Sequence, residues 1–547
     1  MSFATTHGVA LDGALGHLID IQTDVSQGTP GMVVVGRADA AIREGLDRVR
    51  MAVTNSEFQW PSSRRTTFLL SPADLPKSGP HFDLSMAIGV LLATEQLKKV
   101  DRALLERSAF IGELTLAGGL RPAPGVLPMA LAAAQRGIRR IFVPEPQCEE
   151  AQLVPDLEVI GVRSLAQVAA VVSGADELPL APPVAELSGA QLVQWRGADR
   201  LDEVDLADLA GMADEKYAVE VAAAGGHAIL LTGPKGCGKT SLAERVPTLL
   251  PDLALEEALE LTALQSLAGA VAPGAGLARR PPFAAPHHDA SKVSVIGGGS
   301  GRVRPGELSL AHCGVLFLDE FPLFRADLIE ALRQPLESSE ITIARREESV
   351  TLPARALVVL ASNPCPCGNW TAQASTNRCR CLDRVRRVYE ARMSGPIVDR
   401  IDIVRHVRAM SPADVDPFAP AEDSAAVRER VAAARARQAA RFDGCGWRLN
   451  AHVPGPRLKH DWPLEPGAAR LIDAAAGAGR LSARGVVRVQ RLAWTVADLR
   501  AVDAGRAVAV DRPPGVEAVE VALRLRSGTP LDSATVRRRP VAGEVAS

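Results

Sequence analysis

The segment Gly233–Thr240 constrains this chain more than any other, because its sequence GPKGCGKT fits the phosphate-loop pattern GxxxxGK[ST]. It follows the apolar run Ala228–Leu231 and precedes a helix-compatible segment, Ser241–Leu249. Strand, glycine-rich loop and helix therefore come in the order that a phosphate-binding loop requires. The glycines permit a tight loop whose backbone N–H groups face phosphate oxygens. We predict nucleotide binding by an α/β core.

Within this loop, Lys239 is expected to add positive charge near the β- and γ-phosphates, and the Thr240 hydroxyl to bind Mg²⁺. Cys237 is interpreted as a spacer rather than a nucleophile, because no histidine-based pair that would activate it stands nearby in the sequence. The residues expected to contact the nucleotide are Gly233, Pro234, Lys235, Gly236, Cys237, Gly238, Lys239, Thr240, Ser241 and Asp319.

A second apolar run, Gly314–Leu318, ends in the carboxylates of Asp319 and Glu320 and is typical of a buried parallel strand. Asp319 is expected to hold Mg²⁺, and Glu320 to polarise the water that attacks the γ-phosphate. Alone, the two acids would indicate a solvated strand end. Together with the phosphate loop, they favour the catalytic interpretation.

Composition indicates a cytoplasmic globular protein. The chain has 547 residues, 47% of them hydrophobic, which is enough for about three domains. No apolar run reaches the roughly 20 residues of a membrane span, and Asp12 and Asp20 interrupt any N-terminal signal pattern. Eight cysteines are too few for a disulfide scaffold in a chain of this length. A net charge of −2 gives no general basic field, so a polyanion would have to be bound locally.

The periodicity of apolar residues divides the chain into segments of different character. The expected organisation is an α+β domain over 1–175, a linker over 176–201, an α/β nucleotide-binding core with a cysteine-rich insertion over 202–410, a helical domain over 411–525 and a disordered tail over 526–547.

Several further motifs occur in a fixed order around these two. They are Ala222–His227, Ala285–His288, Arg304–Glu307 with Leu310–His312, Asn363–Gly368, and Ser394–Pro396 with Asp399–Asp402. Together the motifs resemble those of the magnesium-chelatase-like AAA+ ATPases of the ComM/YifB type, and the resemblance covers nearly the whole chain.

The resemblance implies an AAA+ P-loop core with an N-terminal Lon-protease-like (ribosomal S5-like) α+β domain and a C-terminal helical lid. It implies a homo-oligomeric ring, usually a hexamer, that hydrolyses ATP at subunit boundaries. The expected function is a DNA motor for branch migration or for processing recombination intermediates during DNA uptake, with single-stranded or branched DNA as partner. The alternatives are an ATPase subunit of a magnesium chelatase and a protein-remodelling factor.

The resemblance also implies roles for three residues. Asn363, which follows an apolar run, matches sensor 1, which orients the attacking water; a turn-forming asparagine is the alternative. Arg400 matches an arginine finger supplied to the neighbouring subunit, although an ion-pair cluster with Asp399 and Asp402 would give the same pattern. Arg484 matches sensor 2, which reaches the same nucleotide from the lid, while a solvated arginine-rich face is the alternative.

The segment Ile341–Leu352 is predicted to form a hairpin with Arg345 and Arg346 at or near its tip. Related ring helicases contact the nucleic-acid backbone with such hairpins, so these arginines are the candidate DNA contacts. An exposed tip whose charge maintains solubility is the alternative. The glycine-rich segment Ala285–Leu308 is a second candidate pore loop.

Cys365, Cys367, Cys379 and Cys381 place four soft ligands close together in the sequence, which suits a structural Zn²⁺ site. One-residue spacing within each pair departs from the usual C-x₂₋₄-C, so reduced thiols or a redox pair remain as alternatives.

In the first domain, His81 stands where proteolytic relatives of the family carry the serine nucleophile, so we predict no protease activity even though Ser78 and Ser85 are near. Lys235, Met212 and Trp494 also depart from the family pattern. None of these changes removes a catalytic group, although Trp494 puts in doubt a lid contact that the family makes with arginine.

Overall fold

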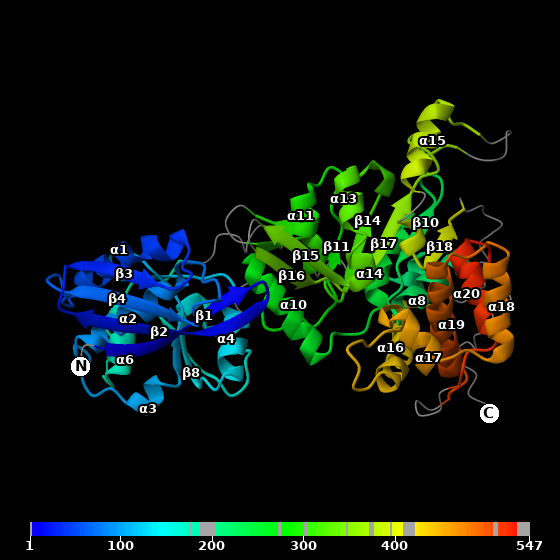
Figure 1. Cartoon of the computed structure of the whole chain (residues 1–547). Helices are drawn as coiled ribbons and strands as arrows, with labels where there is room; N and C mark the ends of the chain where they lie inside the picture. Colours follow the sequence, from blue (N-terminus) through cyan, green and yellow to red (C-terminus); the bar gives the residue numbers. More distant parts are fainter. Residues whose placement is uncertain are drawn as a thin grey trace.

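The computed structural model has three parts that follow one another along the chain and lie side by side in that order (Figure 1). It describes residues 3–175, 177–185, 204–271, 275–299, 303–345, 348–370, 377–393, 397–408, 422–506 and 512–532. Most of the linker expected over 176–201 lies outside these residues. None of the described helices is both long and apolar enough to cross a membrane.

The first part is a mixed seven-stranded sheet in the order β3-β4-β2-β1-β5-β8-β9. Its strands are β1 (Phe3–Asp12), β2 (Leu15–Ser26), β3 (Gly31–Val35), β4 (Arg65–Ser71), β5 (Ser108–Phe110), β8 (Arg140–Pro144) and β9 (Glu158–Val162), with β6 (Glu113–Leu114) and β7 (Leu120–Arg121) paired apart from it. The helices are α1 (Ala40–Asn55), α2 (Asp83–Ala93), α3 (Arg102–Leu105), α4 (Val126–Gln135), α5 (Cys148–Ala151) and α6 (Leu165–Val172).

Helix α2 forms the centre of this first part, because every residue from Asp83 to Leu91 is buried. Gly89 allows the helix to lie directly on the β1–β2 pair: a Cβ at this position would be 2.3 Å from Thr23 Oγ1. Around it, Ile21, Phe68 and Phe82 are completely buried in one apolar cluster. An α+β domain with its own core results.

The central part is a five-stranded sheet in the order β11-β14-β17-β10-β18, parallel throughout. Its strands are β10 (Ile229–Thr232), β11 (Phe283–Ala284), β14 (Val315–Leu318), β17 (Leu357–Ser362) and β18 (Ile403–His406). Strands β14 and β17 are buried at every position, which explains their continuous apolar sequence: both faces of a parallel sheet are covered. The phosphate loop follows β10 and the acidic pair Asp319–Glu320 follows β14, so both lie at the carboxyl ends of the strands, on either side of β17.

Helices surround this sheet, and two short ribbons extend from it. The helices are α8 (Ala213–Gly225), α9 (Lys239–Arg245), α10 (Leu255–Ala268), α11 (Lys292–Ile296), α12 (Glu307–Leu310), α13 (Ala326–Ala331), α14 (Pro335–Ser338) and α15 (Asp383–Arg392). The ribbons pair β12 (Gly297–Gly298) with β13 (Arg304–Pro305), and β15 (Glu340–Arg345) with β16 (Glu348–Pro353).

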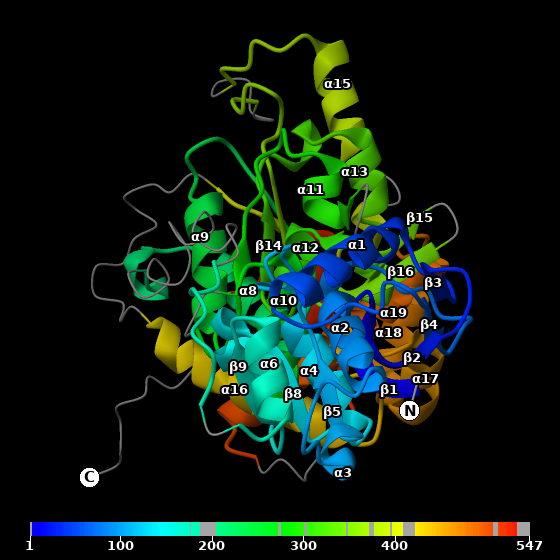
Figure 2. The ribbon, with the colours of Figure 1, turned by 90° about the vertical axis from the view of Figure 1, so that its left-hand side faces the viewer.

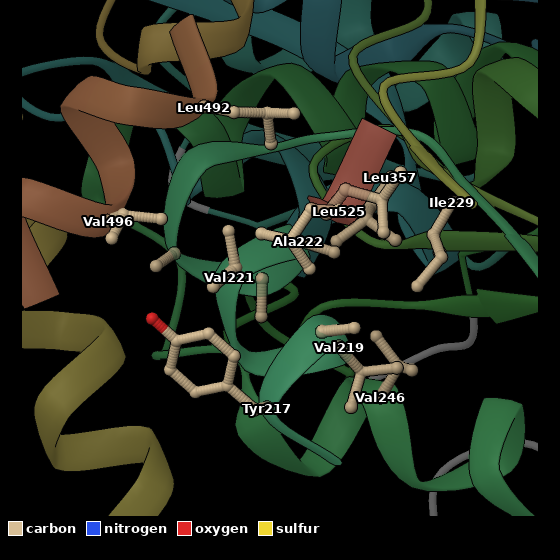
Figure 3. Close-up of a cluster of buried hydrophobic side chains, with 14 of the residues drawn as sticks. Tyr217, Val219, Val221, Ala222, Ile229, Val246, Leu357, Leu492, Val496 and Leu525 are labelled. Carbon is tan, nitrogen blue, oxygen red and sulfur yellow. The ribbon is translucent and has the colours of Figure 1, made fainter. Parts of the chain in front are cut away.

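The third part is helical and consists of α16 (Ser424–Arg441), α17 (Gly455–Asp461), α18 (Pro466–Gly477), α19 (Ala483–Asp503) and α20 (Val516–Ser527). It shares one apolar core with the central sheet (Figure 3). Val221 of α8, Ile229 of β10 and Leu357 of β17 belong to the same buried cluster as Leu492 of α19 and Leu525 of α20. The helical part is therefore packed onto the sheet rather than tethered to it.

The end of the chain is ordered further than its sequence indicates. The tail expected from residue 526 begins within α20, and the described chain continues to 532. The buried Arg405 side chain explains the difference: it donates to Asp214 Oδ1 at 3.0 Å and to the Thr529 carbonyl oxygen at 3.0 Å. Leu531 N–H also donates to Asp214, at 3.0 Å. Residues 533–547 of the expected tail lie outside the described residues.

The first part contacts the central part through α10 and the β15–β16 ribbon, and α4 lies beside α10 (Figures 1 and 2). Gly125 N–H donates to the Ser266 carbonyl oxygen at 3.1 Å, and the Ser266 hydroxyl donates to the Glu150 carboxylate. Leu264, Val350 and Leu352 form a small buried cluster against the turn between β1 and β2.

A buried carboxylate, Asp402, joins the sheet to the helical part. It accepts a hydrogen bond from Arg488 of α19 and another, at 3.2 Å, from Ala228 N–H beside β10. His227 Nδ1 lies 3.5 Å away. Burial raises the pKa of Asp402, but the charge of Arg488 and the contact with His227 outweigh it and hold this pKa well below its usual range.

Replacing Asp402 with Asn should lower the free energy of unfolding by about 3 kcal/mol or more, because Arg488 is left as an uncompensated buried charge. Since the folded-state pKa is depressed, the stabilisation is fully present above the unfolded pKa of about 4, decreases as pH falls below that value and is lost as pH falls through the folded-state pKa. Thermal unfolding at pH 7 and at pH 3 checks both points. The matched control is Asp461→Asn, which removes an exposed ion pair with Arg457. An equal loss in both variants, or a difference that does not shrink at low pH, would contradict this role.

Candidate functional site

The loop between β10 and α9 has the backbone of a phosphate-binding loop. Gly236 and Gly238 have φ angles of +81° and +91°, in the left-handed region that favours glycine. Gly233 is required for another reason, since a Cβ there would lie 2.2 Å from the Val407 carbonyl oxygen of the chain after β18. These two constraints keep the loop compact and bring its backbone close to the start of α9.

Lys239, the first residue of α9, is buried, and its ammonium group is oriented by three oxygens. Nζ donates to the carbonyl oxygens of Gly233 and Pro234 at 2.8 Å each, and to Asn363 Oδ1 at 3.1 Å. The phosphate-loop lysine and the asparagine after β17 therefore belong to one site.

The Mg²⁺ ligands expected from the sequence lie together. Thr240 Oγ1 donates to Asp319 Oδ2 at 2.9 Å, and Asp319 Oδ1 accepts a hydrogen bond from Glu320 N–H at 2.8 Å. A hydroxyl and a carboxylate at the mouth of a phosphate loop are the hard oxygen ligands that Mg²⁺ takes alongside phosphate oxygens. The donor set therefore fits magnesium.

Glu320 stands at the end of β14 with a φ of +49°, an unfavourable backbone region for this residue type. The strained turn directs its carboxylate toward the site, where Oε1 accepts a hydrogen bond from Asn363 Nδ2 at 3.2 Å. Asn363 thus bridges Lys239 and Glu320 through the two ends of one amide. This geometry suits a base that polarises water beside the γ-phosphate and an amide that orients that water.

His288 was not assigned a role from the sequence, although it lies in the quoted motif Ala285–His288. Its Nδ1 is 4.0 Å from Glu320 Oε2, and both residues line one cleft with Thr240, Asp319 and Phe317. One signal in the sequence pointed to this histidine, its place in an ordered motif. Its distance from Glu320 could not be predicted, because it depends on the pairing of β11 with β14.

The remaining loop residues have simpler positions. Lys235 N–H donates to the Gly368 carbonyl oxygen at 3.3 Å, while its side chain is exposed. Cys237 is buried beside Lys239, and burial raises the pKa of its thiol, which fits the interpretation as a spacer. Ser241 follows in α9, where its carbonyl oxygen accepts from Arg245 at 2.9 Å.

Arg400 and Arg484 lie at the opposite end of the sheet from this site. Arg400 precedes β18, so it stands at the amino end of the strands, whereas the phosphate loop stands at their carboxyl ends. Arg400 is buried and its Nη2 is 2.9 Å from Glu337 Oε1; Arg484 Nε lies 3.3 Å from the same oxygen. Helix α19 begins beside Asp399, where Ser482 is hydrogen-bonded, and places Arg484 near Arg400. The sensor-2 role of Arg484 stays a prediction.

Two departures from the family pattern occupy ordinary packing positions. The Met212 sulfur would lie 3.5 Å from a Cβ at Gly238, so Met212 packs against the phosphate loop. Trp494 is buried in α19 and donates from Nε1 to the Trp462 carbonyl oxygen at 3.1 Å. It belongs to an apolar cluster with Phe442.

In the first part, the side chains of His81 and of the polar residues near it are hydrogen-bonded to backbone carbonyl oxygens. His81 Nε2 lies 2.8 Å from the Val9 carbonyl oxygen, and Ser85 Oγ donates to the Phe110 carbonyl oxygen at 2.6 Å. The Lys77 ammonium group is buried and donates to the Pro72 carbonyl oxygen. These contacts stabilise the turn into α2, and the absence of protease activity stays a prediction.

The hairpin predicted over Ile341–Leu352 is present as β15 and β16, paired in antiparallel register from Glu340↔Pro353 to Arg345↔Glu348. Arg345 therefore lies at the end of the ribbon away from its base. Arg346 lies outside the described residues.

The four cysteines after Asn363 converge, and their sulfur atoms all lie within 4.8 Å of one another. The backbone N–H groups of Arg380 and Asn369 lower the pKa of the Cys367 thiol to about 6. All eight cysteines of the chain are free thiols.

Comparison with known proteins identifies this arrangement. The family model of magnesium chelatase, subunit ChlI, matches residues 205–415; that of subunit ChlI of Mg-chelatase matches residues 21–147; and that of the ChlI C-terminal region matches residues 421–512. The Lon protease of Mycolicibacterium smegmatis is 26% identical over 31% of this chain and 22% of its own length.

Longer matches cover all three parts of the chain. An uncharacterized protein of Mycobacterium tuberculosis is 42% identical over 96% of this chain and 99% of its own. The competence protein ComM of Haemophilus influenzae and the uncharacterized protein YifB of Escherichia coli are each 38% identical over 91% of this chain and 94% of their own. The fold is α/β, with an AAA+ P-loop core, a Lon-protease-like N-terminal domain and a helical C-terminal part, and the chain belongs to the magnesium chelatase-like AAA+ ATPases of the ComM/YifB family.

Proposed function

We propose that this ATPase is a ring-forming motor that acts on single-stranded or branched DNA, in branch migration or the processing of recombination intermediates during DNA uptake. The observation that carries the proposal is the position of Arg400 and Arg484 at the end of the sheet opposite the phosphate loop, and the likeness to a competence protein supports it. Free thiols at all eight cysteines agree with a cytoplasmic location.

At the carboxyl ends of the strands, the chain's own residues bind and orient the reactants. Thr240 and Asp319, which are hydrogen-bonded to each other, would hold Mg²⁺, and the ion would supply charge neutralisation at the β- and γ-phosphates. Lys239 adds a second positive charge. Glu320 is placed to accept a proton from the attacking water, and Asn363 to hold that water in line.

At the amino ends of the strands, Arg400 and Arg484 form a cationic pair around Glu337. They stand at the end of the sheet opposite the phosphate loop, so we assign them to the nucleotide of a neighbouring subunit in a ring, where they would act at its γ-phosphate. Within one chain, the Glu337 carboxylate offsets the charge of the two guanidinium groups and orients them. This arrangement supports a homo-oligomer, with a hexamer as the expected ring.

DNA would contact the β15–β16 hairpin. Its end carries Arg345, with Arg346 next in sequence, and a ring repeats this pair in every subunit. Phosphate contacts need few cations when they are repeated, so a chain with net charge −2 is compatible with DNA binding.

Glu320→Gln should retain ATP binding and lose at least about 100-fold in turnover, since the amide cannot accept a proton from water. Steady-state hydrolysis and equilibrium binding of a fluorescent ATP analogue separate the two effects. Glu429→Gln, at an exposed position of α16, is the control and should leave both unchanged. Wild-type turnover in Glu320→Gln would remove the residue from the catalytic role.

Arg400→Ala should abolish hydrolysis, and mixing it with Lys239→Ala subunits should restore part of it, because the mixed ring contains interfaces with both groups intact. Glu337→Gln is the structural control: it breaks the same ion pair but leaves the arginine. If mixing restores nothing, or if Glu337→Gln loses as much activity as Arg400→Ala, the trans-acting role fails.

ATP hydrolysis measured with no DNA, single-stranded DNA, duplex and a four-way junction tests the motor proposal, with Glu320→Gln as blank. We expect single-stranded or junction DNA to stimulate turnover. Turnover that responds to no DNA would instead favour a protein-remodelling factor or a chelatase-type subunit.

Arg345→Ala with Arg346→Ala should weaken DNA binding and flatten its salt dependence by about one to two counterions per site.

A further inference from the structure

The four-cysteine cluster, defined as Cys365, Cys367, Cys379 and Cys381, has the dimensions of a site for a single metal ion. Its measured sulfur separations are 3.3 Å for Cys365 to Cys367, 3.7 Å for Cys367 to Cys379 and 3.6 Å for Cys379 to Cys365. Four thiolates around Zn²⁺ at about 2.3 Å would lie about 3.8 Å apart. One-residue spacing within each pair therefore does not prevent convergence.

The same distances argue against other uses of the sulfurs. A disulfide requires sulfurs at about 2.05 Å, and all four residues are free thiols. A two-iron cluster would need cysteine pairs separated by two metal ions, whereas all four sulfurs here lie within 4.8 Å of one another. Tetrahedral coordination by four soft sulfurs is the preference of Zn²⁺.

Backbone N–H groups surround the sulfurs, as expected for thiolate ligands. Cys381 N–H donates to Cys379 Sγ at 3.4 Å. Cys365 accepts from the backbone of Trp370 and Asn369, and Cys367 from that of Arg380 and Asn369. Such bonds offset the charge that four thiolates bring to one metal ion.

The cluster is joined directly to the ATP site. Cys365 begins a turn in which Gly368 N–H donates to the Cys365 carbonyl oxygen at 2.9 Å, and the Gly368 carbonyl oxygen accepts from Lys235 N–H of the phosphate loop. A Cβ at Gly368 would lie 3.0 Å from Lys235 Cβ and 3.7 Å from Asn363 Cγ. The turn is therefore in contact with both the phosphate loop and the amide that bridges Lys239 and Glu320.

The chain that leaves the cluster after Cys381 returns to the end of β17. Helix α15 begins shortly after Cys381, and its buried Tyr389 hydrogen-bonds to the Ser362 side chain and to the backbone of Asn363. A metal ion bound by all four cysteines would join Cys365 and Cys367, near the end of β17, to Cys379 and Cys381, before α15. Both arms would then hold the end of β17 in place.

We propose that the four-cysteine cluster binds one Zn²⁺ ion, and that this ion fixes the turn that positions Asn363 and the phosphate loop, so that ATP turnover depends on metal occupancy. The binding half stands independently of the proposed function, while the coupling half rests on the catalytic role given there to Asn363. The cysteines are positioning residues, because none of them reaches the nucleotide loop itself.

Metal content of the full chain, purified without chelator and passed through gel filtration, tests the binding half. We expect about one zinc per chain by elemental analysis, and at least a tenfold loss of zinc in Cys367→Ser and in Cys379→Ser. Cys445→Ser changes a partly buried thiol outside the cluster and should keep its zinc. If the serine variants do not fold, wild-type protein stripped by a chelator and titrated with Co²⁺ should develop the visible absorption of tetrahedral cobalt thiolate. Iron in place of zinc, or no metal together with no cobalt spectrum, would overturn the proposal.

The coupling half is tested on the stripped wild-type protein. Turnover should fall about tenfold, return on addition of Zn²⁺, and fall much more than the affinity for a fluorescent ATP analogue. Unchanged turnover after complete zinc loss would overturn the coupling while leaving the site. If the zinc-loaded protein hydrolyses ATP at a rate that no DNA changes, the motor proposal is overturned and the metal site is not. The two failures are therefore distinguishable.

Discussion

The placement of β17 between β14 and β10 is the constraint on which the ATP site depends. In the sequence, the phosphate loop comes first, the acidic pair second and Asn363 last, but in the sheet the strand before Asn363 lies in the middle. Its amide therefore reaches Lys239 on one side at 3.1 Å and Glu320 on the other at 3.2 Å. A strand order that followed the sequence would separate one of these groups from the amide.

The amino ends of the same strands are fixed by a different kind of interaction. Arg488 of α19 neutralises the buried Asp402, whose other oxygen accepts the Ala228 N–H at the entrance to β10. This contact joins the first turns of α19 to the sheet, and the Ser482 cap, which also donates to Asp399, places Arg484 near Arg400. The sheet thus holds the phosphate loop and the acidic pair at the carboxyl ends of its strands, and Arg400 with Arg484 at the amino ends.

The sequence predicted local elements better than their meeting points. Buried parallel strands need apolar residues on both faces, so β14 and β17 could be recognised as runs, and the glycines of the phosphate loop follow from its backbone geometry. The end of the sheet at which Arg484 lies could not be inferred, because it depends on how α19 packs against α8 and against the turn before β18. The convergence of the four cysteines and the proximity of His288 to Glu320 likewise arise from contacts between distant segments.

The β15–β16 hairpin connects the first part of the chain to the ATPase core. Its base is apolar and shared: Val350 and Leu352 are buried with Leu264 of α10, and a Cβ at Gly13, in the turn between β1 and β2, would lie 2.7 Å from Val350. Such close packing leaves no room for the hairpin to slide past that turn. A change in the ATP site that moves the hairpin must therefore either move the Lon-like domain with it or break this apolar contact. The end carrying Arg345 is free of that restriction only as far as the ribbon itself bends.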